Sequence, residues 1–290
     1  MLHVRNQESC TRFTQRCRRL ILQHILNVWI SCLAVKIATW NVNSITARLP
    51  LVLQWMRTAR PDVLCLQETK CMDERFPREA FAELGYVSET FGQKTYNGVA
   101  IVSRTACEDV QRGFHDDAED AHARLLAATV KGIRIVNIYV PNGAFVGSDK
   151  YDFKLQWLRR LREFFDDHYW NDDDVLVCGD FNIAPEDRDV HDPEQWRGKI
   201  LFSKREREAL EHLREWGFVD AFRLHNAAGG EFSWWDYRAG SFRRNTGLRI
   251  DHIWVSEALA ARCAGAWIDR EPRGWERPSD HTPVVASFKS

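Results

Sequence analysis

The chain has 290 residues, of which 44% are hydrophobic and 28% are charged, so it can form one large globular domain with an ample core. Its formal net charge is -1 at pH 7, which excludes a protein that holds nucleic acid by overall positive charge. Any contact with a polyanion must therefore use a local basic surface.

Residues 1–34 differ in pattern from the rest of the chain. Arg16, Arg18 and Arg19 precede an apolar stretch at 20–35 that is too short and too interrupted by polar residues to span a membrane. A cleaved targeting segment is the alternative, although Glu8 is untypical of a transit peptide. We expect an N-terminal extension at 1–34, either disordered or an amphipathic helix, and a folded domain at 35–290.

From residue 35 onward, short aliphatic runs alternate with longer amphipathic ones, as in an α/β protein. Strands are expected at 36–40, 62–66, 98–103, 125–130 and 133–140, with a first helix at 49–58. A helix at 150–167, a strand at 175–178, a helix at 204–215 and strands at 252–255 and 283–288 follow. Only Lys131 and Gly132 separate two of these strands, which therefore form a hairpin, so the sheets should be mixed.

Polar side chains suited to metal and phosphate chemistry follow apolar strand-like runs at six places. They are Asn41, Glu68, Tyr139 with Asn142, Asp180 with Asn182, Asp251, and Asp280 with His281. The strand ends of a layered sheet meet at one edge, so side chains far apart in the sequence can share a pocket. We expect these six places to form one site.

The residue types in this set indicate a divalent metal. Glu68 and Asp280 are hard oxygen donors that suit Mg²⁺ or Mn²⁺. The eight cysteines of the chain form no close pairs, so no cluster typical of zinc competes for the metal. The amides of Asn41, Asn142 and Asn182 do not titrate, and they suit the orientation of a metal, a water or a phosphate.

Two further members could move or donate protons. Tyr139 offers a hydroxyl donor to a phosphate oxygen, and the unperturbed pKa of a histidine falls near neutrality, which makes His281 a candidate base or phosphate ligand. Each residue alone has a simpler explanation: the segment at 180–185 could be a turn, Glu68 a surface carboxylate and His281 a structural histidine. The prediction therefore depends on the whole set.

Six short motifs resemble bacterial exodeoxyribonuclease III and occur in that family's order. They are Trp40-Asn41-Val42-Asn43, Leu66-Gln67-Glu68-Thr69-Lys70, Tyr139-Val140-Pro141-Asn142-Gly143, Gly179-Asp180-Phe181-Asn182, Gly247-Leu248-Arg249-Ile250-Asp251 and Ser279-Asp280-His281. The similarity covers roughly residues 35–290. It implies membership of the exodeoxyribonuclease III and abasic-site (AP) endonuclease family, in the exonuclease-endonuclease-phosphatase superfamily. The implied fold is a four-layered α/β sandwich, with two packed mixed β-sheets flanked by helices.

The resemblance also implies the roles of the charged residues. Glu68 would bind Mg²⁺, with Mn²⁺ as the alternative, helped by Asn41 and Asp280. Asp180 would lie beside the attacking water or the leaving oxygen. His281 would take a proton from water or bind the scissile phosphate, and the choice of base between it and Asp180 stays open.

The remaining members would orient and hold the phosphate. By the same resemblance Asp251 would orient the histidine, while Tyr139, Asn142 and Asn182 would hold phosphate oxygens. Water would attack in line and leave a 3′-hydroxyl. The implied protein is a divalent-metal-dependent DNA phosphodiesterase of base excision repair, with 3′-to-5′ exonuclease, abasic-site endonuclease and 3′-end-cleaning activity.

The segment at 232–244 interleaves aromatic and basic residues, as a loop that contacts bases and phosphates would. The alternative is that Trp234 and Trp235 are core aromatics, which we favour for one of the two. In relatives that cut abasic sites this region supplies an apolar pocket for the sugar that lacks a base. The candidate substrate-binding residues are Asn142, Lys94, Trp234, Arg238, Leu248 and Ile250.

The expected partner is double-stranded DNA with abasic sites or 3′ ends, bound by a monomer at the nucleoid in the bacterial cytoplasm, with no membrane contact. The segment at 144–148 lacks the arginine of some eukaryotic relatives, so the balance of activities cannot be copied from them. One alternative is a relative with a non-nucleic substrate, such as an inositol phosphatase or a sphingomyelinase. Another is an inactive DNA-binding or scaffold protein, against which Glu68, Asp180, Asp251 and His281 argue.

Overall fold

The computed structural model describes residues 34–114 and 122–289. Within them, Lys36–Phe288 belong to one compact unit. The expected extension at 1–34 lies outside the described residues, apart from Ala34. Its separation from a catalytic domain at 35–290 stays a prediction.

The first of two six-stranded sheets contains the first strand of the chain and the last. Its strands are β1 (Ala34–Asn41), β2 (Val63–Gln67), β3 (Val87–Phe91), β4 (Val99–Ser103), β11 (Cys263–Ile268) and β12 (Val284–Lys289). Their order is β11-β12-β1-β2-β4-β3. The β1–β2 pair is parallel, whereas the pairs β2–β4, β3–β4 and β11–β12 are antiparallel, so this sheet is mixed.

The second sheet has the same size and is also mixed. Its strands are β5 (Glu108–Arg112), β6 (Leu125–Val130), β7 (Ile133–Tyr139), β8 (Val175–Asp180), β9 (Val219–Asp220) and β10 (Asp251–Val255), in the order β5-β6-β7-β8-β10-β9. The predicted β6–β7 hairpin is present, and both of its turn residues, Lys131 and Gly132, have positive φ. Positive φ at both central residues gives a turn that follows the twist of the two strands.

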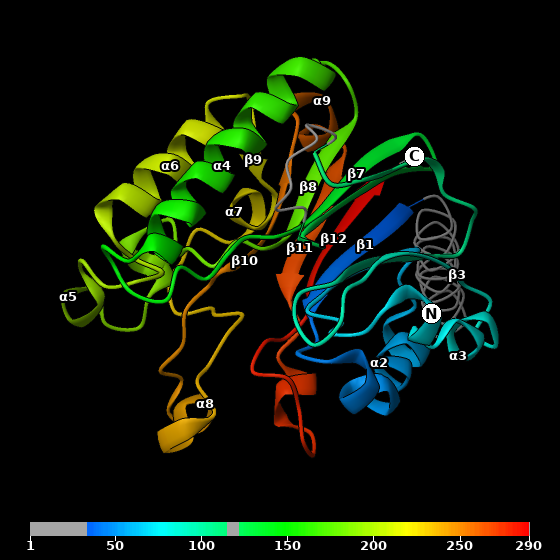
Figure 1. Ribbon diagram of the computed structural model, residues 1–290, viewed down its shortest axis with the longest axis horizontal. Coiled ribbons are helices and arrows are strands. Elements are labelled where there is room, and N and C mark those ends of the chain that lie inside the picture. Colours follow the sequence, from blue (N-terminus) through cyan, green and yellow to red (C-terminus); the bar gives the residue numbers. More distant parts are fainter. Residues whose placement is uncertain (1–33, 115–121, 290) are drawn as a thin grey trace, which may run out of the picture. The chain divides into compact units, whose positions relative to one another are not determined.

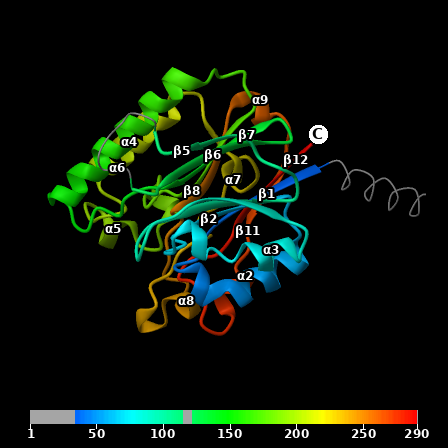
Figure 2. The same ribbon diagram turned by 45° about the vertical axis from the view of Figure 1, so that its right-hand side comes forward.

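Helices connect many of the strands of the two sheets. The longer ones are α2 (Ile45–Ala59), α4 (Asp149–His168) and α6 (Lys204–Arg214); the shorter ones are α3 (Arg78–Ala82), α5 (Pro193–Trp196), α7 (Ala221–His225), α8 (Ser241–Arg244) and α9 (Glu257–Ala260). Figures 1 and 2 show α4 and α6 over the sheet that contains β7 and β8, and α2 and α3 over the sheet that contains β1 and β2. The predicted order of layers, helix, sheet, sheet and helix, is confirmed.

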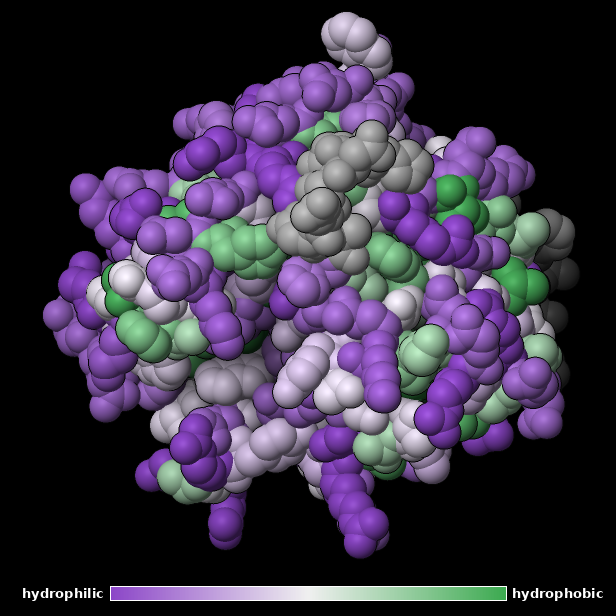
Figure 3. Space-filling model, in the orientation of Figure 1, coloured by the Kyte–Doolittle hydropathy of each residue, from purple (hydrophilic) through white to green (hydrophobic). Residues whose placement is uncertain are grey.

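Two apolar cores bind these helices to the sheets. Trp157, Leu161 and Phe165 of α4 pack with Val136 and Val177 of the second sheet. The other core contains Val52 and Trp55 of α2, Trp40 of β1 and Leu64 of β2. The face in Figure 3 is mainly hydrophilic, with small separate hydrophobic areas. Among the described residues, no helix has the length and apolarity that crossing a bilayer requires.

Helix α2 begins four residues before the predicted start. The side chain of Ser44 accepts a hydrogen bond from Ala47 N, which caps the helix at Ile45, and Pro50 lies inside the helix. Proline is common in the first turn and costly further in, which is why the sequence favoured a later start. The helices predicted at 150–167 and 204–215 agree with α4 and α6 to within one residue at each end.

Candidate active site

The ends of four strands and the start of a fifth meet at one edge of the two sheets. Asn41 ends β1, Glu68 directly follows β2, Tyr139 ends β7 and Asp180 ends β8. Asp251 begins β10, and the strand register places Tyr139 and Asp251 opposite Asp180 on its two sides. Residues that the sequence spreads over more than 200 positions therefore share one edge.

Three of these residues form a cluster that could hold a metal ion. Ligand atoms of Glu68, Asp180 and His281 all lie within 4.8 Å of one another. The Nδ2 atom of Asn41 donates to Glu68 Oε1 and to Asp180 Oδ2, both at 2.8 Å, and so connects the carboxylates of the two sheets. Carboxylate oxygens are the donors that hard divalent cations prefer, so this cluster is a candidate metal site.

Asp280 lies beside this cluster and has other contacts. Its Oδ1 accepts from Asn43 Nδ2 and its Oδ2 accepts from Trp234 Nε1, each at 3.0 Å. Lys70 reaches the cluster from the same side, with Nζ 2.8 Å from Glu68 Oε2 and 2.7 Å from Asn43 Oδ1. The Lys70 cation lowers the pKa of Glu68 against the effect of burial. Glu68 is therefore held as a carboxylate.

His281 lies between two carboxylates. Its Nδ1 is 2.8 and 3.1 Å from the two oxygens of Asp251, and its Nε2 is 3.7 Å from Asp180 Oδ2. Burial alone would lower the pKa of His281, but ion pairing, first with Asp251 and then with Asp180, raises it to about 10. At neutral pH the ring is an imidazolium, which donates hydrogen bonds. A hard divalent cation would prefer the carboxylate oxygens of the cluster.

Asp180 is the carboxylate at the centre of the site. It accepts hydrogen bonds from Asn41 Nδ2, from the backbone N of Asn182 at 2.9 Å and from Asn182 Nδ2 at 3.2 Å. Burial raises the pKa of Asp180 to about 7, although the His281 cation opposes this. A carboxylate with a pKa near neutrality can both take up and release a proton at working pH.

Hydrogen-bond donors surround that carboxylate. Burial, with the Glu68 and Asp180 charges, raises the pKa of Tyr139 well above its usual value, so its hydroxyl keeps its proton. Asn142 Nδ2 donates to Asn182 Oδ1 at 3.0 Å, and Asn142 is exposed. The two asparagines and the tyrosine thus lie where they could hold the oxygens of an anionic substrate.

Comparison with known proteins agrees with this geometry. The Endonuclease/Exonuclease/phosphatase family matches residues 38–281. Exodeoxyribonuclease III of Haemophilus influenzae is 36% identical over 267 residues, which are 88% of this chain and 100% of that protein. The chain belongs to the exodeoxyribonuclease III/AP endonuclease family. It is a hydrolase of that type.

Solved structures of this family share the fold. An AP endonuclease from Archaeoglobus fulgidus superposes with a TM-score of 0.85 at 40% identity, covering 88% of this chain and 100% of that one. A 3′ phosphatase from Neisseria, bound to a product DNA hairpin, has a TM-score of 0.85 at 44% identity with the same coverage. The predicted family and the predicted fold class are confirmed.

The aromatic segment of this family member divides its two tryptophans as expected. Trp235 is fully buried, whereas Trp234 is half-buried and pairs through its backbone with Leu248 and His281. Leu248 and Ile250 are 0% and 1% exposed, so a sugar could not contact their side chains in this conformation. Both belong to an apolar cluster against which Trp234 packs. They support the tryptophan instead of lining an open pocket.

The two basic residues predicted to bind substrate, Arg238 and Lys94, are exposed and lie on different segments. Arg238 pairs with both oxygens of Asp236, at 3.0 and 2.9 Å. Lys94 lines a cavity of about 660 Å³ together with Lys70 and Arg75. Because Lys70 also contacts Glu68, this basic cavity lies next to the candidate metal cluster.

Two charged residues of the site region were not predicted. Lys70 lies within a motif quoted from the sequence, and its place directly after Glu68 was a usable signal. Lys154 is fully buried in α4 and donates to the backbone carbonyl of Asn182 at 2.7 Å. Its position in an amphipathic helix gave no signal, because a lysine there usually lies in solvent.

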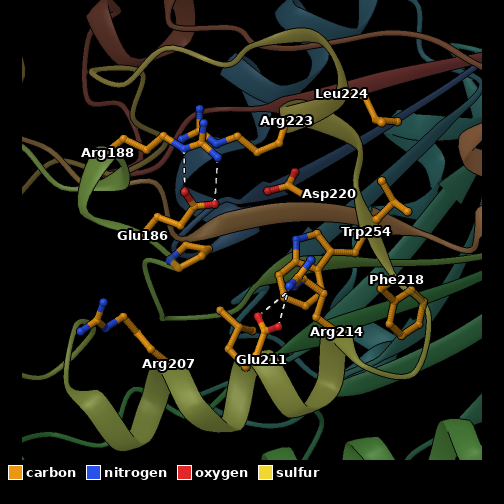
Figure 4. A pocket seen from close by; sticks show the side chains of 13 residues that line it. Glu186, Arg188, Arg207, Glu211, Arg214, Phe218, Asp220, Arg223, Leu224 and Trp254 are labelled. Carbon is orange, nitrogen blue, oxygen red and sulfur yellow. Dashed lines mark hydrogen bonds and ion pairs between the residues drawn. The ribbon is translucent and has the colours of Figure 1, made fainter.

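A second cavity, of about 550 Å³, lies between α6 and the segment at 185–188 (Figure 4). Arg188 pairs with Glu186 at 2.8 Å, and Arg214 pairs with Glu211. None of the residues of the six motifs lines it. We therefore place the chemistry at the sheet edge, where the residues of the six motifs meet.

Proposed function

We propose that this protein is a divalent-metal-dependent DNA phosphodiesterase of base excision repair. It would cut at abasic sites, remove nucleotides from 3′ ends and clear blocked 3′ ends. The single observation that carries the proposal is the cluster of Glu68, Asp180 and His281, with ligand atoms within 4.8 Å of one another beside two asparagines. Relatives described as exodeoxyribonuclease III, AP endonuclease and DNA-bound 3′ phosphatase support it.

Local charge supports DNA over a non-nucleic substrate. The chain as a whole has a net charge of -1, yet Lys70, Arg75 and Lys94 line one cavity next to the cluster. Phosphate contacts of this kind bind a polyanionic backbone without reading its sequence. Double-stranded DNA with an abasic site or a 3′ end is therefore the proposed substrate. We propose a monomer that acts at the nucleoid of the bacterial cytoplasm.

The donor set fits Mg²⁺, with Mn²⁺ as the alternative. Glu68 would supply carboxylate oxygens to the ion, with Asp180 beside it, and Asn41 would orient both carboxylates. When bound, the ion would neutralise phosphate charge and activate water. The expected help from Asp280 stays a prediction, because Asp280 is not part of the cluster of Glu68, Asp180 and His281.

Side chains of the site would carry out the proton transfer and hold the phosphate oxygens. Asp180, central and with a pKa of about 7, would take the proton of the attacking water. His281, held by Asp251 as a cation, would donate to a phosphate oxygen. Tyr139, Asn142 and Asn182 would donate to the other oxygens as negative charge develops on them, and in-line attack would leave a 3′-hydroxyl.

A duplex oligonucleotide with one abasic site tests this function. We expect incision with Mg²⁺, no incision with EDTA, and shortening of a separate duplex with a recessed, undamaged 3′ end. The matched samples are the wild type and a Glu68→Gln variant. If the wild type left both duplexes intact but hydrolysed an inositol phosphate or sphingomyelin, the non-nucleic alternative would replace the proposal.

A further inference from the structure

One ammonium group lies directly behind the two asparagines of the site. The side chain of Lys154 is 0% exposed, and its Nζ has three hydrogen-bond acceptors. It lies 2.7 Å from the backbone O of Asn182, 3.2 Å from the backbone O of Asn142 and 2.5 Å from Glu206 Oε1. An ammonium has three N–H donors, so each acceptor occupies one of them.

Glu206 anchors this ammonium to the start of α6. Its Oε1 also accepts from Leu201 N at 3.0 Å, and its Oε2 accepts from the backbone N and the hydroxyl of Ser203 at 2.9 and 2.6 Å. Ser203 and Glu206 form the capping box of the helix. These contacts at the start of α6 hold the Glu206 carboxylate in place independently of Lys154.

The loops that carry the asparagines pass close around the lysine. Gly143 has φ +91, and a Cβ there would lie 3.2 Å from Lys154 Cδ and 2.9 Å from Ile200 Cδ1. Asn182 also has a positive φ, of 52°. The two loops thus bring the backbone carbonyls of Asn142 and Asn182 to the buried ammonium of Lys154.

A buried ion pair is a weak way to gain stability. Removing two charges from water is costly, and an apolar pair of similar volume is often as stable or more stable. An apolar pair could fill the space of Lys154 and Glu206, but it could not hold the carbonyl oxygens of Asn142 and Asn182. The need to hold these two carbonyl oxygens therefore explains the Lys154–Glu206 pair better than a gain in folding stability does.

We propose that Lys154 is a positioning residue for the reaction: by fixing the carbonyls of Asn142 and Asn182, it sets the separation of the two amide side chains that hold the phosphate. This inference rests on the proposed function for the role of the amides. Those side chains touch each other, with Asn142 Nδ2 3.0 Å from Asn182 Oδ1, so a shift of either loop changes the donor pair. Glu68 makes no contact with Lys154, and metal binding should not depend on it.

The paired substitution Lys154→Met with Glu206→Leu removes both charges and keeps an apolar filling. We expect a thermal unfolding curve that stays cooperative, and a kcat for abasic-site cleavage that falls about 10- to 100-fold, the size of a misplacement near 1 Å. KM for the duplex and the Mg²⁺ concentration at half-maximal rate should change less than about 3-fold. The matched control is Lys150→Met, because Lys150 is exposed on the same helix.

A double-mutant cycle shows whether the lysine acts through the asparagine. In an Asn182→Ala background the same paired substitution should lower kcat clearly less than it does in the wild type, because its target is already gone. Equal losses in both backgrounds, or an unchanged kcat in a folded variant, would overturn the inference. If the paired variant does not fold, Lys154→Met with Glu206→Gln, which keeps a capping residue at the start of α6, takes its place with the same expected and opposing outcomes.

A spectroscopic readout separates this inference from the proposed function. In a ¹H–¹⁵N spectrum recorded without DNA or metal, the side-chain amide signals of Asn142 and Asn182 should shift or broaden in the paired variant and stay in place in Lys150→Met. Signals that do not move would reject the role of Lys154, whatever substrate the wild type cleaves. A wild type inactive on both DNA duplexes, with amide signals that do move, would reject only the proposed function.

Discussion

Replacing Asp251 with Asn tests how the site keeps its histidine protonated. The Asp251 carboxylate lies 2.8 Å from His281 Nδ1, and ion pairing raises the pKa of His281 from 6.5 to about 10 against the effect of burial. A rise of that size corresponds to roughly 5 kcal/mol in favour of the imidazolium. Because Asn is neutral and Asp251 is the largest source of the rise, the pKa of His281 should fall in the variant, where only Asp180 and Asp280 still raise it against burial.

The direction of the pH dependence follows from the protonation state of His281 that binds the phosphate. The imidazolium donates to phosphate below its pKa, and this donor is lost as the pH rises through the pKa. The wild type should therefore keep its rate up to pH 9, whereas the rate of Asp251→Asn should start to fall at a lower pH, by about tenfold per pH unit above the lowered pKa of its His281.

Single-turnover cleavage of the abasic duplex from pH 6 to pH 9, at saturating Mg²⁺, measures this difference. The control is Asp172→Asn, because Asp172 is exposed in the turn before β8. If the rates of Asp251→Asn and the wild type run parallel between pH 7 and pH 9, the ion-pairing argument is refuted. A uniform loss at every pH would assign Asp251 an orienting role alone.

Three further predictions concern the metal, the base and the aromatic segment. Glu68→Gln should lower turnover at least about 100-fold with folding intact. The control Glu74→Gln changes an exposed glutamate and should leave turnover unchanged. Normal turnover by Glu68→Gln at low Mg²⁺ would contradict the assignment of Glu68 as the metal ligand. The wild-type rate should fall about tenfold per pH unit below 7 as Asp180 is protonated, and a rate independent of pH between 5.5 and 7 would exclude it as the base. Trp234→Ala should lower abasic-site cleavage about 10- to 100-fold and hydrolysis of a small phosphodiester much less, whereas equal losses would remove its proposed contact with DNA.

The sequence could predict that the site residues converge because central strands leave a clear pattern. Strands β1, β2, β7 and β8 are largely buried and mostly apolar, so the polar residue at or just after the end of each is conspicuous. Asn41, Glu68, Tyr139 and Asp180 were all found in this way. Their convergence follows from the parallel pairs β1–β2 and β7–β8, whose ends lie at the same edge.

The four strands that were not predicted are the four edge strands of the two sheets, β11, β3, β5 and β9. An edge strand has one unpaired side and partial exposure, so its residues need not form an apolar run. Glu89 in β3 and Glu108 in β5 show this, since charged side chains lie within the strands. Only the finished sheet reveals that these segments pair.

The burial of single residues was less predictable than their place in the site. Leu248 and Ile250 were expected to line an open pocket, yet both are buried behind Trp234. Lys154 was not considered, yet it is fully buried because Glu206 and two backbone carbonyls meet its ammonium. Each outcome depends on contacts between distant segments, which a local pattern of residue types does not contain.

Asp280 is one member of a chain of hydrogen bonds that crosses the site. Trp234 Nε1 donates to Asp280 Oδ2 at 3.0 Å, and Asn43 Nδ2 donates to Asp280 Oδ1 at 3.0 Å. Lys70 then donates to Asn43 Oδ1 at 2.7 Å and pairs with Glu68 at 2.8 Å. An anion at Asp280 is needed to accept from both neighbours, since a protonated carboxyl or an amide would offer a hydrogen to one of them. Asp280 therefore joins the aromatic side of the site to the carboxylate proposed to bind the metal, a connection that its residue type alone could not show.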